Sequence, residues 1–326
     1  MDICVFSSQP YDETYLRQAA PHLNWRFIQQ PLDLVSVQNA VGAKAICVFV
    51  NDKLNAQLID VLADMGIRQV LLRCAGFNNV DVAYAKSRGI AVARVPAYSP
   101  EAVAEHCVAM MLCLNRKLHK AYNRVRDDNF SLVGLLGFNL HGKTVGIIGT
   151  GRIGLATARI LHGFGMQVLC YDIQPTPEQL PANARYVSLE QLYSQSDIVS
   201  LHCPLTPQTH HLVNADTLRL MKDGVMLINT SRGGLIDTQA VIEALKSKRI
   251  GLLGLDVYEQ EADLFFKDLS DQVIGDEVFQ RLLTFPNVLI TGHQAFFTDE
   301  AMTQIAQTTV GNYMALRDGL PCSNLL

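Results

Sequence analysis

The chain has 326 residues, of which 49% are hydrophobic and 18% are charged, a balance typical of a globular protein with a well-filled core. The 27 basic and 31 acidic residues leave a formal net charge of −4, so there is no electrostatic reason to expect binding to nucleic acid or to an anionic membrane. The length allows two domains of ordinary size.

The eight cysteines contain no Cys-x-x-Cys pair, and most of them stand within apolar runs. We therefore expect buried, reduced thiols and a reducing compartment. The N-terminal Met-Asp-Ile-Cys-Val lacks the positive region of a signal peptide, and the longest apolar stretch, 102–114, is interrupted by Glu105 and His106. That stretch is also too short to span a bilayer, so the sequence predicts a cytoplasmic protein.

Short runs rich in β-branched residues alternate with helical patterns along almost the whole chain. Continuous apolar strands that alternate with helices are typical of parallel sheets covered on both faces. A first series of strands is predicted at 3–7, 45–50, 69–74 and 90–95, and a second at 144–148, 167–171, 198–202, 225–229, 251–256 and 288–291. The fold class is therefore α/β, with two doubly wound parallel-sheet domains.

One long helix is predicted between the two series. Ser99 suits the N-cap and Pro100 the first helical position, where the missing N–H costs nothing. Apolar residues then recur at helical spacing and make one apolar face at Val103, Cys107, Met110, Leu114 and Leu118. The tail after about residue 296 is again helical in pattern. We expect it to return to the first domain, so that the domains are 1–99 with 297–326, and 100–296.

A glycine turn stands at the start of the second domain. Residues 144–156 read as strand, tight turn and helix, with Gly149 for the turn, Gly151 for close approach to a pyrophosphate, and Gly154 for helix–strand packing. The next strand ends at Asp172, which is placed to accept hydrogen bonds from adenosine ribose hydroxyls. Residues 173–175 include no arginine or lysine that could hold a 2′-phosphate, so NAD is predicted in preference to NADP.

Three polar residues follow strands of the same predicted sheet, namely Arg232, Glu261 and His293. Parallel strands place them at one sheet edge, outside the carboxyl ends of the strands, where ligands bind. A guanidinium can hold the carboxylate of a 2-oxo acid bidentately, and a histidine can protonate its carbonyl oxygen as a hydride arrives. A carboxylate beside that histidine favours its protonated form.

Six segments together make the sequence resemble the NAD-dependent D-2-hydroxyacid dehydrogenase family, and within it the fermentative D-lactate dehydrogenase branch. They are residues 95–106, Gly-Thr-Gly-Arg-Ile-Gly at 149–154, Leu-His-Cys-Pro-Leu-Thr at 201–206, Asn-Thr-Ser-Arg-Gly-Gly at 229–234, Leu-Asp-Val-Tyr-Glu-Gln-Glu at 255–261 and Gly-His-Gln-Ala-Phe at 292–296. The resemblance implies a Rossmann NAD-binding domain at 100–296 and a flavodoxin-like substrate domain formed by 1–99 and 297–326.

The resemblance also implies roles for individual residues. Arg232 is expected to bind the substrate carboxylate, and His293 to donate the proton while paired with Glu261. The remaining cofactor contacts are expected from Arg152, Ile153, Cys203, Pro204, Thr230 and Asp256, the last of them facing the nicotinamide carboxamide. The remaining substrate contacts are expected from the backbone at Ala75 and Gly76, from Tyr98, and from Phe296, which would bound a small methyl pocket.

The reaction expected from this set is the reversible reduction of pyruvate to D-lactate by NADH. One alternative is the same chemistry on a bulkier 2-oxo acid, glyoxylate or hydroxypyruvate. An alternative of another class is an NAD-sensing interaction protein similar to the related corepressors, because fold does not fix function. We expect a homo-oligomer, a dimer or tetramer, with subunit contacts from 102–118 or from the segment containing Phe265 and Phe266.

Three further histidines raise the question of a metal site. His202 adjoins Cys203, and His210 and His211 are neighbours in the chain. No second group of ligands at a suitable spacing appears in the sequence, so no metal is predicted.

Overall fold

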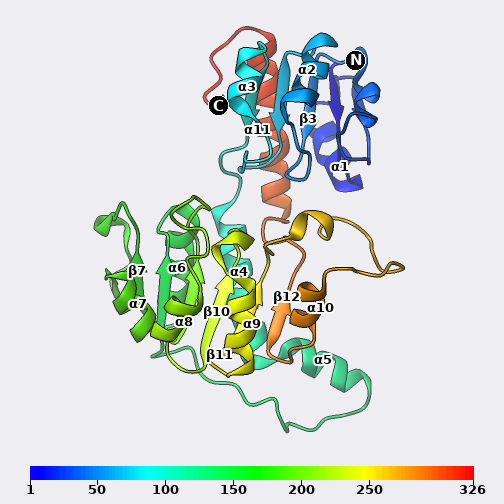
Figure 1. Ribbon diagram of the computed structural model, residues 1–326. Coiled ribbons are helices and arrows are strands. Elements are labelled where there is room, and N and C mark those ends of the chain that lie inside the picture. Colours follow the sequence, from blue (N-terminus) through cyan, green and yellow to red (C-terminus); the bar gives the residue numbers. More distant parts are fainter. The chain divides into compact units, whose positions relative to one another are not determined.

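Two parallel β-sheets form the framework of the protein (Figure 1). The computed structural model describes the whole chain, residues 1–326, apart from the side chain of Asp263. Contacts within the chain define two compact units. Unit 1 consists of Met1–Ser99 with Phe297–Leu326, and unit 2 is Pro100–Phe296.

Unit 1 contains a five-stranded parallel sheet in the order β2-β1-β3-β4-β5, the order of the flavodoxin-like fold. Its strands are β1 (Ile3–Val5), β2 (Trp25–Phe27), β3 (Ala45–Val48), β4 (Gln69–Leu72) and β5 (Ala91–Arg94). Its helices are α1 (Pro10–Ala19), the short 3-10 helix η1 (Ser36–Ala40), α2 (Ala56–Asp64), α3 (Val82–Ser87) and α11 (Asp299–Arg317). Separate apolar cores lie on the two faces of the sheet.

The C-terminal helix α11 belongs to the core of unit 1. Its residues Ala306, Val310 and Tyr313 pack in one buried cluster with Ile3 and Val5 of β1. In Figure 1 this helix, coloured red, lies among the blue elements formed by the start of the chain. Unit 1 is therefore assembled from both ends of the sequence.

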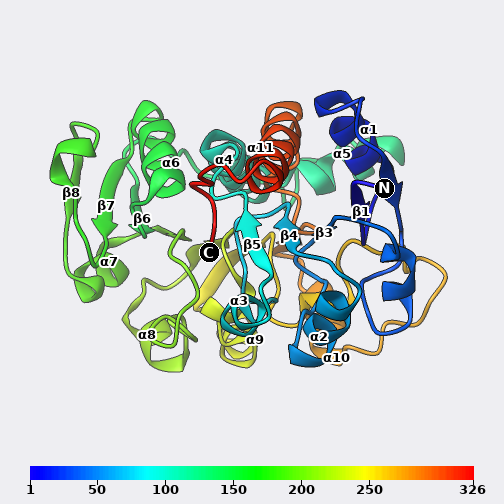
Figure 2. The ribbon, with the colours of Figure 1, turned by 90° about the horizontal axis from the view of Figure 1, so that it is seen from above.

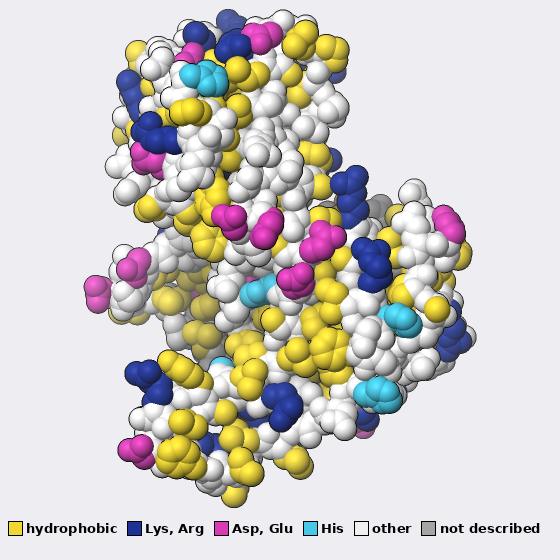
Figure 3. Space-filling model, turned by 180° about the vertical axis from the view of Figure 1, so that it is seen from behind, with side chains coloured by type: hydrophobic (Ala, Val, Ile, Leu, Met, Phe, Trp, Pro, Cys, Tyr) yellow, Lys and Arg dark blue, Asp and Glu magenta, His cyan; other side chains and the backbone are white. Residues whose placement is uncertain are grey.

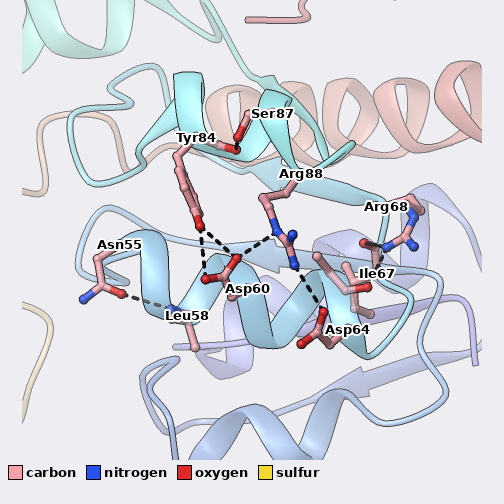
Figure 4. Close-up of polar contacts among 10 residues, drawn as sticks. Asn55, Leu58, Asp60, Asp64, Ile67, Arg68, Tyr84, Ser87 and Arg88 are labelled. Atoms are coloured by element: carbon pink, nitrogen blue, oxygen red, sulfur yellow. Dashed lines mark hydrogen bonds and ion pairs between the residues drawn. The ribbon is translucent and has the colours of Figure 1, made fainter.

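Polar side chains join α2 to α3 on the surface of unit 1 (Figure 4). The carboxylate of Asp60 accepts hydrogen bonds from the Tyr84 hydroxyl at 3.0 and 3.1 Å, and it forms an ion pair with Arg88 at 2.8 Å. A second carboxylate, that of Asp64, lies 3.2 Å from Arg88. Exposed pairs of this kind each contribute about 0–1 kcal/mol, so the apolar core dominates the packing of these two helices.

Unit 2 contains a seven-stranded parallel sheet in the order β12-β11-β10-β9-β6-β7-β8, which is the Rossmann order with one further strand. Its strands are β6 (Thr144–Ile148), β7 (Gln167–Tyr171), β8 (Ala184–Tyr186), β9 (Ile198–Leu201), β10 (Val225–Asn229), β11 (Ile250–Leu255) and β12 (Val288–Ile290). Its helices are α4 (Pro100–Arg116), α5 (Leu118–Arg126), α6 (Arg152–Gly163), α7 (Leu189–Gln195), α8 (Ala215–Leu220), α9 (Thr238–Lys246) and α10 (Glu277–Leu283), with 3-10 helices η2 (Pro177–Gln179), η3 (Gly233–Leu235) and η4 (Glu261–Asp263).

Helices cover both faces of this sheet. In Figure 2, α4 and α6 lie on one side of the strands, whereas α7, α8 and α9 lie on the other. One buried cluster contains Cys107 and Leu114 of α4 with Leu161 of α6, and a second contains residues of α7, α8, α9 and α10. The predicted fold class, two doubly wound parallel-sheet domains, is confirmed.

The predicted central helix ends earlier than its apolar spacing indicated. It stops at Arg116, because Lys117 adopts a left-handed conformation with φ of 51° and interrupts the helical hydrogen bonds. The next helix, α5, begins at Leu118, whose side chain is exposed rather than buried. Leu118 therefore does not belong to the apolar face, whereas Val103, Cys107, Met110 and Leu114 are buried as expected.

Many apolar side chains of the two segments proposed for subunit contacts belong to the core. The apolar residues of α4 are buried under the sheet of unit 2, and Phe265 is buried in the opposite cluster with Phe266 packed against it. A group of exposed apolar side chains lies on the segment that follows α4, at the lower left of Figure 3. They are Leu118, Tyr122, Val125, Phe130, Leu132, Val133 and Leu136.

All eight cysteines are free, and six of them are buried. No helix among the described residues combines the length and apolarity needed to cross a membrane.

Candidate functional site

The glycine turn connects the carboxyl end of β6 to the start of α6. Gly149 has φ of +94°, which residues with a side chain rarely adopt, and a Cβ there would lie 2.5 Å from the backbone nitrogen of Cys203. A Cβ at Gly154 would lie 1.9 Å from the carbonyl oxygen of Gly149. Helix and strand thus approach so closely that both positions exclude any side chain.

The remaining glycine of the motif faces open space. Gly151 is the N-cap of α6, and no atom lies within 4 Å of where its Cβ would be. Arg152 and Ile153 follow as the first residues of the helix, where free N–H groups and the positive end of the dipole attract an anion. Thr230 directly follows β10 and is buried. The open cradle at the N-terminus of α6 fits the pyrophosphate of a dinucleotide.

Asp172 follows β7 and is tied to the glycine turn. One carboxylate oxygen accepts hydrogen bonds from the Thr150 N–H at 2.6 Å and from the Thr150 hydroxyl at 3.1 Å. The other oxygen accepts from the Gln174 N–H at 2.9 Å and keeps further acceptor capacity. The sequence indicated Asp172 but not Thr150, whose hydroxyl also contacts that of Tyr186 at 2.8 Å.

Cys203 and Pro204 lie just beyond β9, beside the turn. Cys203 is buried, and burial raises the pKa of its thiol to about 11, so the thiol stays protonated and unreactive. Its carbonyl oxygen accepts a hydrogen bond from the Ser231 hydroxyl at 2.7 Å, which links this segment to the one that carries Arg232. Cys203 therefore acts as an apolar wall of the turn.

Arg232 follows β10 and immediately precedes the short helix η3. Its guanidinium donates one hydrogen bond, to the Ser231 carbonyl at 2.7 Å, and makes no other with the described residues. The backbone after it is pressed against another loop, since a Cβ at Gly233 would lie 2.1 Å from the carbonyl carbon of Tyr258. The loops after β10 and β11 are thus in direct contact.

His293 and Glu261 form a hydrogen-bonded pair at the same sheet edge. The His293 Nδ1 atom lies 2.8 Å from Glu261 Oε1, and the second oxygen of Glu261 accepts a hydrogen bond from the Tyr258 N–H at 2.9 Å. The ring of Phe266 lies beside the imidazole, with centroids 5.7 Å apart. Because Nδ1 is engaged, the Nε2 atom is the one available to a ligand.

Asp256, fully buried, organises the loop that carries His293. Its carboxylate accepts hydrogen bonds from the Thr291 hydroxyl at 2.5 Å and from the N–H groups of Gln294 and Ala295, both at 2.9 Å. Its own carbonyl oxygen accepts the His293 N–H at 2.7 Å. Oδ2 accepts only the Ala295 N–H and keeps further acceptor capacity, and the contact of Asp256 with the nicotinamide carboxamide stays a prediction.

The same carboxylate is charged despite its burial. Burial opposes the charged form of Asp256, but hydrogen bonds from the His106 ring, the Thr291 hydroxyl and the two loop N–H groups outweigh it and lower its pKa below the usual value. His106 comes from α4, and its Nε2 lies 3.2 Å from Thr291 Oγ1 and 3.4 Å from Asp256.

The expected substrate contacts from the first domain lie in unit 1. Ala75 and Gly76 follow β4, and Tyr98 follows β5. The carbonyl oxygens of Ala75 and Gly76 accept hydrogen bonds from Arg94 at 2.8 Å and from the Cys74 thiol at 3.3 Å. Their N–H groups have no partner among the described residues and remain available as donors. Phe296, at the end of unit 2, is buried.

Comparisons with known proteins identify the family of the chain. Residues 108–295, more than half of the chain, match the family model for the D-isomer specific 2-hydroxyacid dehydrogenase, NAD binding domain. A D-lactate dehydrogenase of Escherichia coli is 52% identical, with all of both chains covered. The pyruvate reductase of Chlamydomonas reinhardtii superposes with a TM-score of 0.95 at 44% identity, over 99% of this chain and 98% of that one. A D-lactate dehydrogenase from Aquifex aeolicus, complexed with NAD and lactic acid, has a TM-score of 0.85 at 37% identity, over 97% and 96% of the two chains.

A Rossmann unit with a histidine–carboxylate pair and an arginine at one sheet edge defines an NAD-dependent oxidoreductase. The chain belongs to the D-isomer-specific 2-hydroxyacid dehydrogenase family.

The tight contact at the glycine turn predicts the effect of one added methyl group. Gly154→Ala forces the Cβ against the Gly149 carbonyl, so we expect the free energy of unfolding to fall by about 1–3 kcal/mol and NADH affinity to fall with it. Gly163→Ala, at the exposed end of the same helix and with no atom near its Cβ, is the matched control. It should be neutral or stabilising by up to about 1 kcal/mol. Urea unfolding and NADH fluorescence titration measure both effects, and equal behaviour of the two variants would contradict the packing argument.

Proposed function

We propose that the protein is a D-lactate dehydrogenase, which reversibly reduces pyruvate to D-lactate with NADH. The observation that carries this proposal is the His293–Glu261 pair, 2.8 Å apart, at the sheet edge where the loop bearing Arg232 contacts the loop bearing Glu261. A 2-oxo acid presents a carboxylate and a carbonyl oxygen, and these residues offer a guanidinium and a proton donor that match them. The names of the Escherichia coli and Chlamydomonas reinhardtii proteins point to the same reaction.

The residues divide the work of this reaction. Bound NADH supplies the hydride that reduces the C2 carbon of pyruvate. Arg232 holds the substrate carboxylate with its unused guanidinium donors, and His293 gives the Nε2 proton to the C2 oxygen as charge develops there. Glu261 accepts the hydrogen bond from Nδ1 and so orients the ring and stabilises its protonated form. In the reverse direction His293 takes up the hydroxyl proton.

The cofactor contacts proposed for this chain are those that the glycine motif and the family resemblance imply for the Rossmann unit. The turn at Gly149, Gly151 and Gly154 with Arg152 and Ile153 would hold the pyrophosphate, and Asp172 the adenosine ribose. Further contacts are assigned to Cys203, Pro204, Thr230 and Asp256.

We assign the remaining substrate contacts to unit 1 and to Phe296. The free N–H groups of Ala75 and Gly76 and the side chain of Tyr98 would contact the substrate carboxylate. Phe296 would bound the methyl pocket. On this assignment unit 1 is the substrate domain and unit 2 the NAD-binding domain. The eight free cysteines support a reducing compartment, the cytoplasm.

The reaction is tested by NADH consumption across a panel of 2-oxo acids. We expect the highest kcat/KM with pyruvate, lower values with glyoxylate, hydroxypyruvate and bulkier 2-oxo acids, and a product of D configuration. A preference for one of the other acids would reassign the substrate within the family. NADH binding without oxidation by any acid of the panel would instead favour a sensor of NAD.

The proton donor is tested by His293→Gln. Because the amide cannot supply the proton, kcat should fall by about 10²–10⁴, while the dissociation constant for NADH should stay within about twofold. His22→Gln, an exposed histidine of unit 1, is the control and should leave both constants unchanged. Near-native turnover of His293→Gln would remove this residue from the proton-transfer step.

We further infer a homo-oligomer assembled through the exposed apolar segment after α4. Leu132, Val133 and Leu136 are each more than 80% exposed, and clustered apolar side chains of this kind mark protein interfaces (Figure 3). Leu132→Glu combined with Leu136→Glu should lower the mass measured by light scattering towards that of one chain. Val273→Glu, at a lone exposed valine, should leave the mass unchanged. A wild-type protein with the mass of one chain would refute the inference.

A further inference from the structure

A cluster of potential metal ligands lies outside the residues used so far. His210 and His211 are in the loop after β9, and Glu259 is in the loop after β11. One ligand atom from each of the three residues lies within 4.8 Å of the other two. The two imidazole rings are stacked with centroids 3.9 Å apart, and His211 Nε2 lies 2.6 Å from Glu259 Oε1.

The surrounding structure holds two of these side chains in place. The second oxygen of Glu259 accepts a hydrogen bond from the Thr238 hydroxyl at 2.9 Å, which orients the carboxylate. His211 has φ of 50°, an unfavourable conformation for a residue with a side chain. Its N–H donates to the Gly234 carbonyl, and its carbonyl accepts from the Asn214 amide, both at 2.9 Å. Several contacts thus impose a strained backbone at this residue, a condition common at functional sites.

The third side chain has unused ligand atoms. Neither ring nitrogen of His210 has a hydrogen-bond partner among the described residues, although the ring is held against that of His211. The side chains of His211 and Glu259 are 34% and 27% exposed, so the site is reached from solvent. A partly exposed His–Glu ion pair contributes little stability and does not account for the strained His211 or for the placement of His210.

We propose that His210, His211 and Glu259 bind a divalent cation of the borderline class, with Zn²⁺ as the best match. Two imidazole nitrogens and one carboxylate oxygen are a common three-residue Zn²⁺ set, and water completes the tetrahedron. Imidazole also suits Cu²⁺ and Ni²⁺, whereas Mg²⁺ and Ca²⁺ prefer oxygen ligands throughout. The Thr238 hydroxyl serves as the outer contact that fixes the carboxylate.

The cation joins the loop after β11, which carries Glu261, to the loop after β9, which carries the proposed cofactor contacts Cys203 and Pro204. Glu259 is separated from Glu261 by one residue, and the Tyr258 N–H donates to Glu261, the partner of His293. Occupation of the site ties this loop to the loop after β9. Because the cation binds the folded chain, it raises the unfolding temperature.

The experiment measures Zn²⁺ binding to the untagged full-length protein by calorimetry, with chelator competition for tight binding. We expect one Zn²⁺ per chain and a rise in the unfolding temperature. His210→Gln, His211→Gln and Glu259→Gln should each weaken binding about tenfold or more and abolish the rise. The controls are His22→Gln, an exposed histidine elsewhere, and Cys113→Ser with Cys322→Ser, which removes the two partly exposed thiols.

The outcomes separate this site from the other places where Zn²⁺ could bind. Unchanged affinity in the combined His210→Gln and His211→Gln variant would overturn the proposal. Loss of binding in His293→Gln alone would place the cation at the catalytic pair, and loss in the cysteine variant would place it on thiols. Either of those two losses of binding would also overturn the proposed site at His210, His211 and Glu259. Zn²⁺ binding is measured without turnover, so failure of this proposal can be distinguished from failure of the proposed dehydrogenase reaction.

Discussion

The buried carboxylate of Asp256 is the constraint on which the catalytic edge depends. It stands at the carboxyl end of β11 and binds the loop after β12 through the Thr291 hydroxyl and two backbone N–H groups. That loop would otherwise be free to adopt many conformations, yet His293 is held in a left-handed conformation with φ of 54°. A charge removed from water needs such hydrogen bonds, and the loop must close over Asp256 to provide them. The same closure brings the imidazole to Glu261.

The strands of the two sheets could be predicted from the sequence where they are buried on both faces. The strands 144–148, 167–171 and 225–229 have the predicted bounds, because their apolar runs end at residues that leave the sheet. Two strands were missed, β2 (Trp25–Phe27) and β8 (Ala184–Tyr186). Both are three-residue edge strands with an exposed arginine at the centre, so they lack the apolar signal. The end of α4 was also missed, since Lys117 turns the chain without the glycine or proline that usually marks a helix end.

The residues of the candidate site also fall into two groups, those that the sequence indicated and those that only the fold brings together. Motifs local in sequence indicated the glycine turn, Arg232 and His293, because each follows a strand directly. Contacts between distant segments could not be predicted, because nothing in the sequence shows that His211 contacts Glu259 or that His106 contacts Thr291. The argument that His210 and His211 lack a further ligand rested on spacing along the chain, and the fold supplies that ligand from another loop.

The split composition of unit 1 constrains the order in which the protein can fold during synthesis. Unit 2 is one continuous stretch, so its core can close before residue 297 leaves the ribosome. Unit 1 cannot, because Ile3 and Val5 wait for Val310 and Tyr313 of α11 to cover them. The first strands made are therefore the last to be fully buried. Their apolar face stays open to chaperones, or to aggregation, for as long as the remaining chain takes to be made.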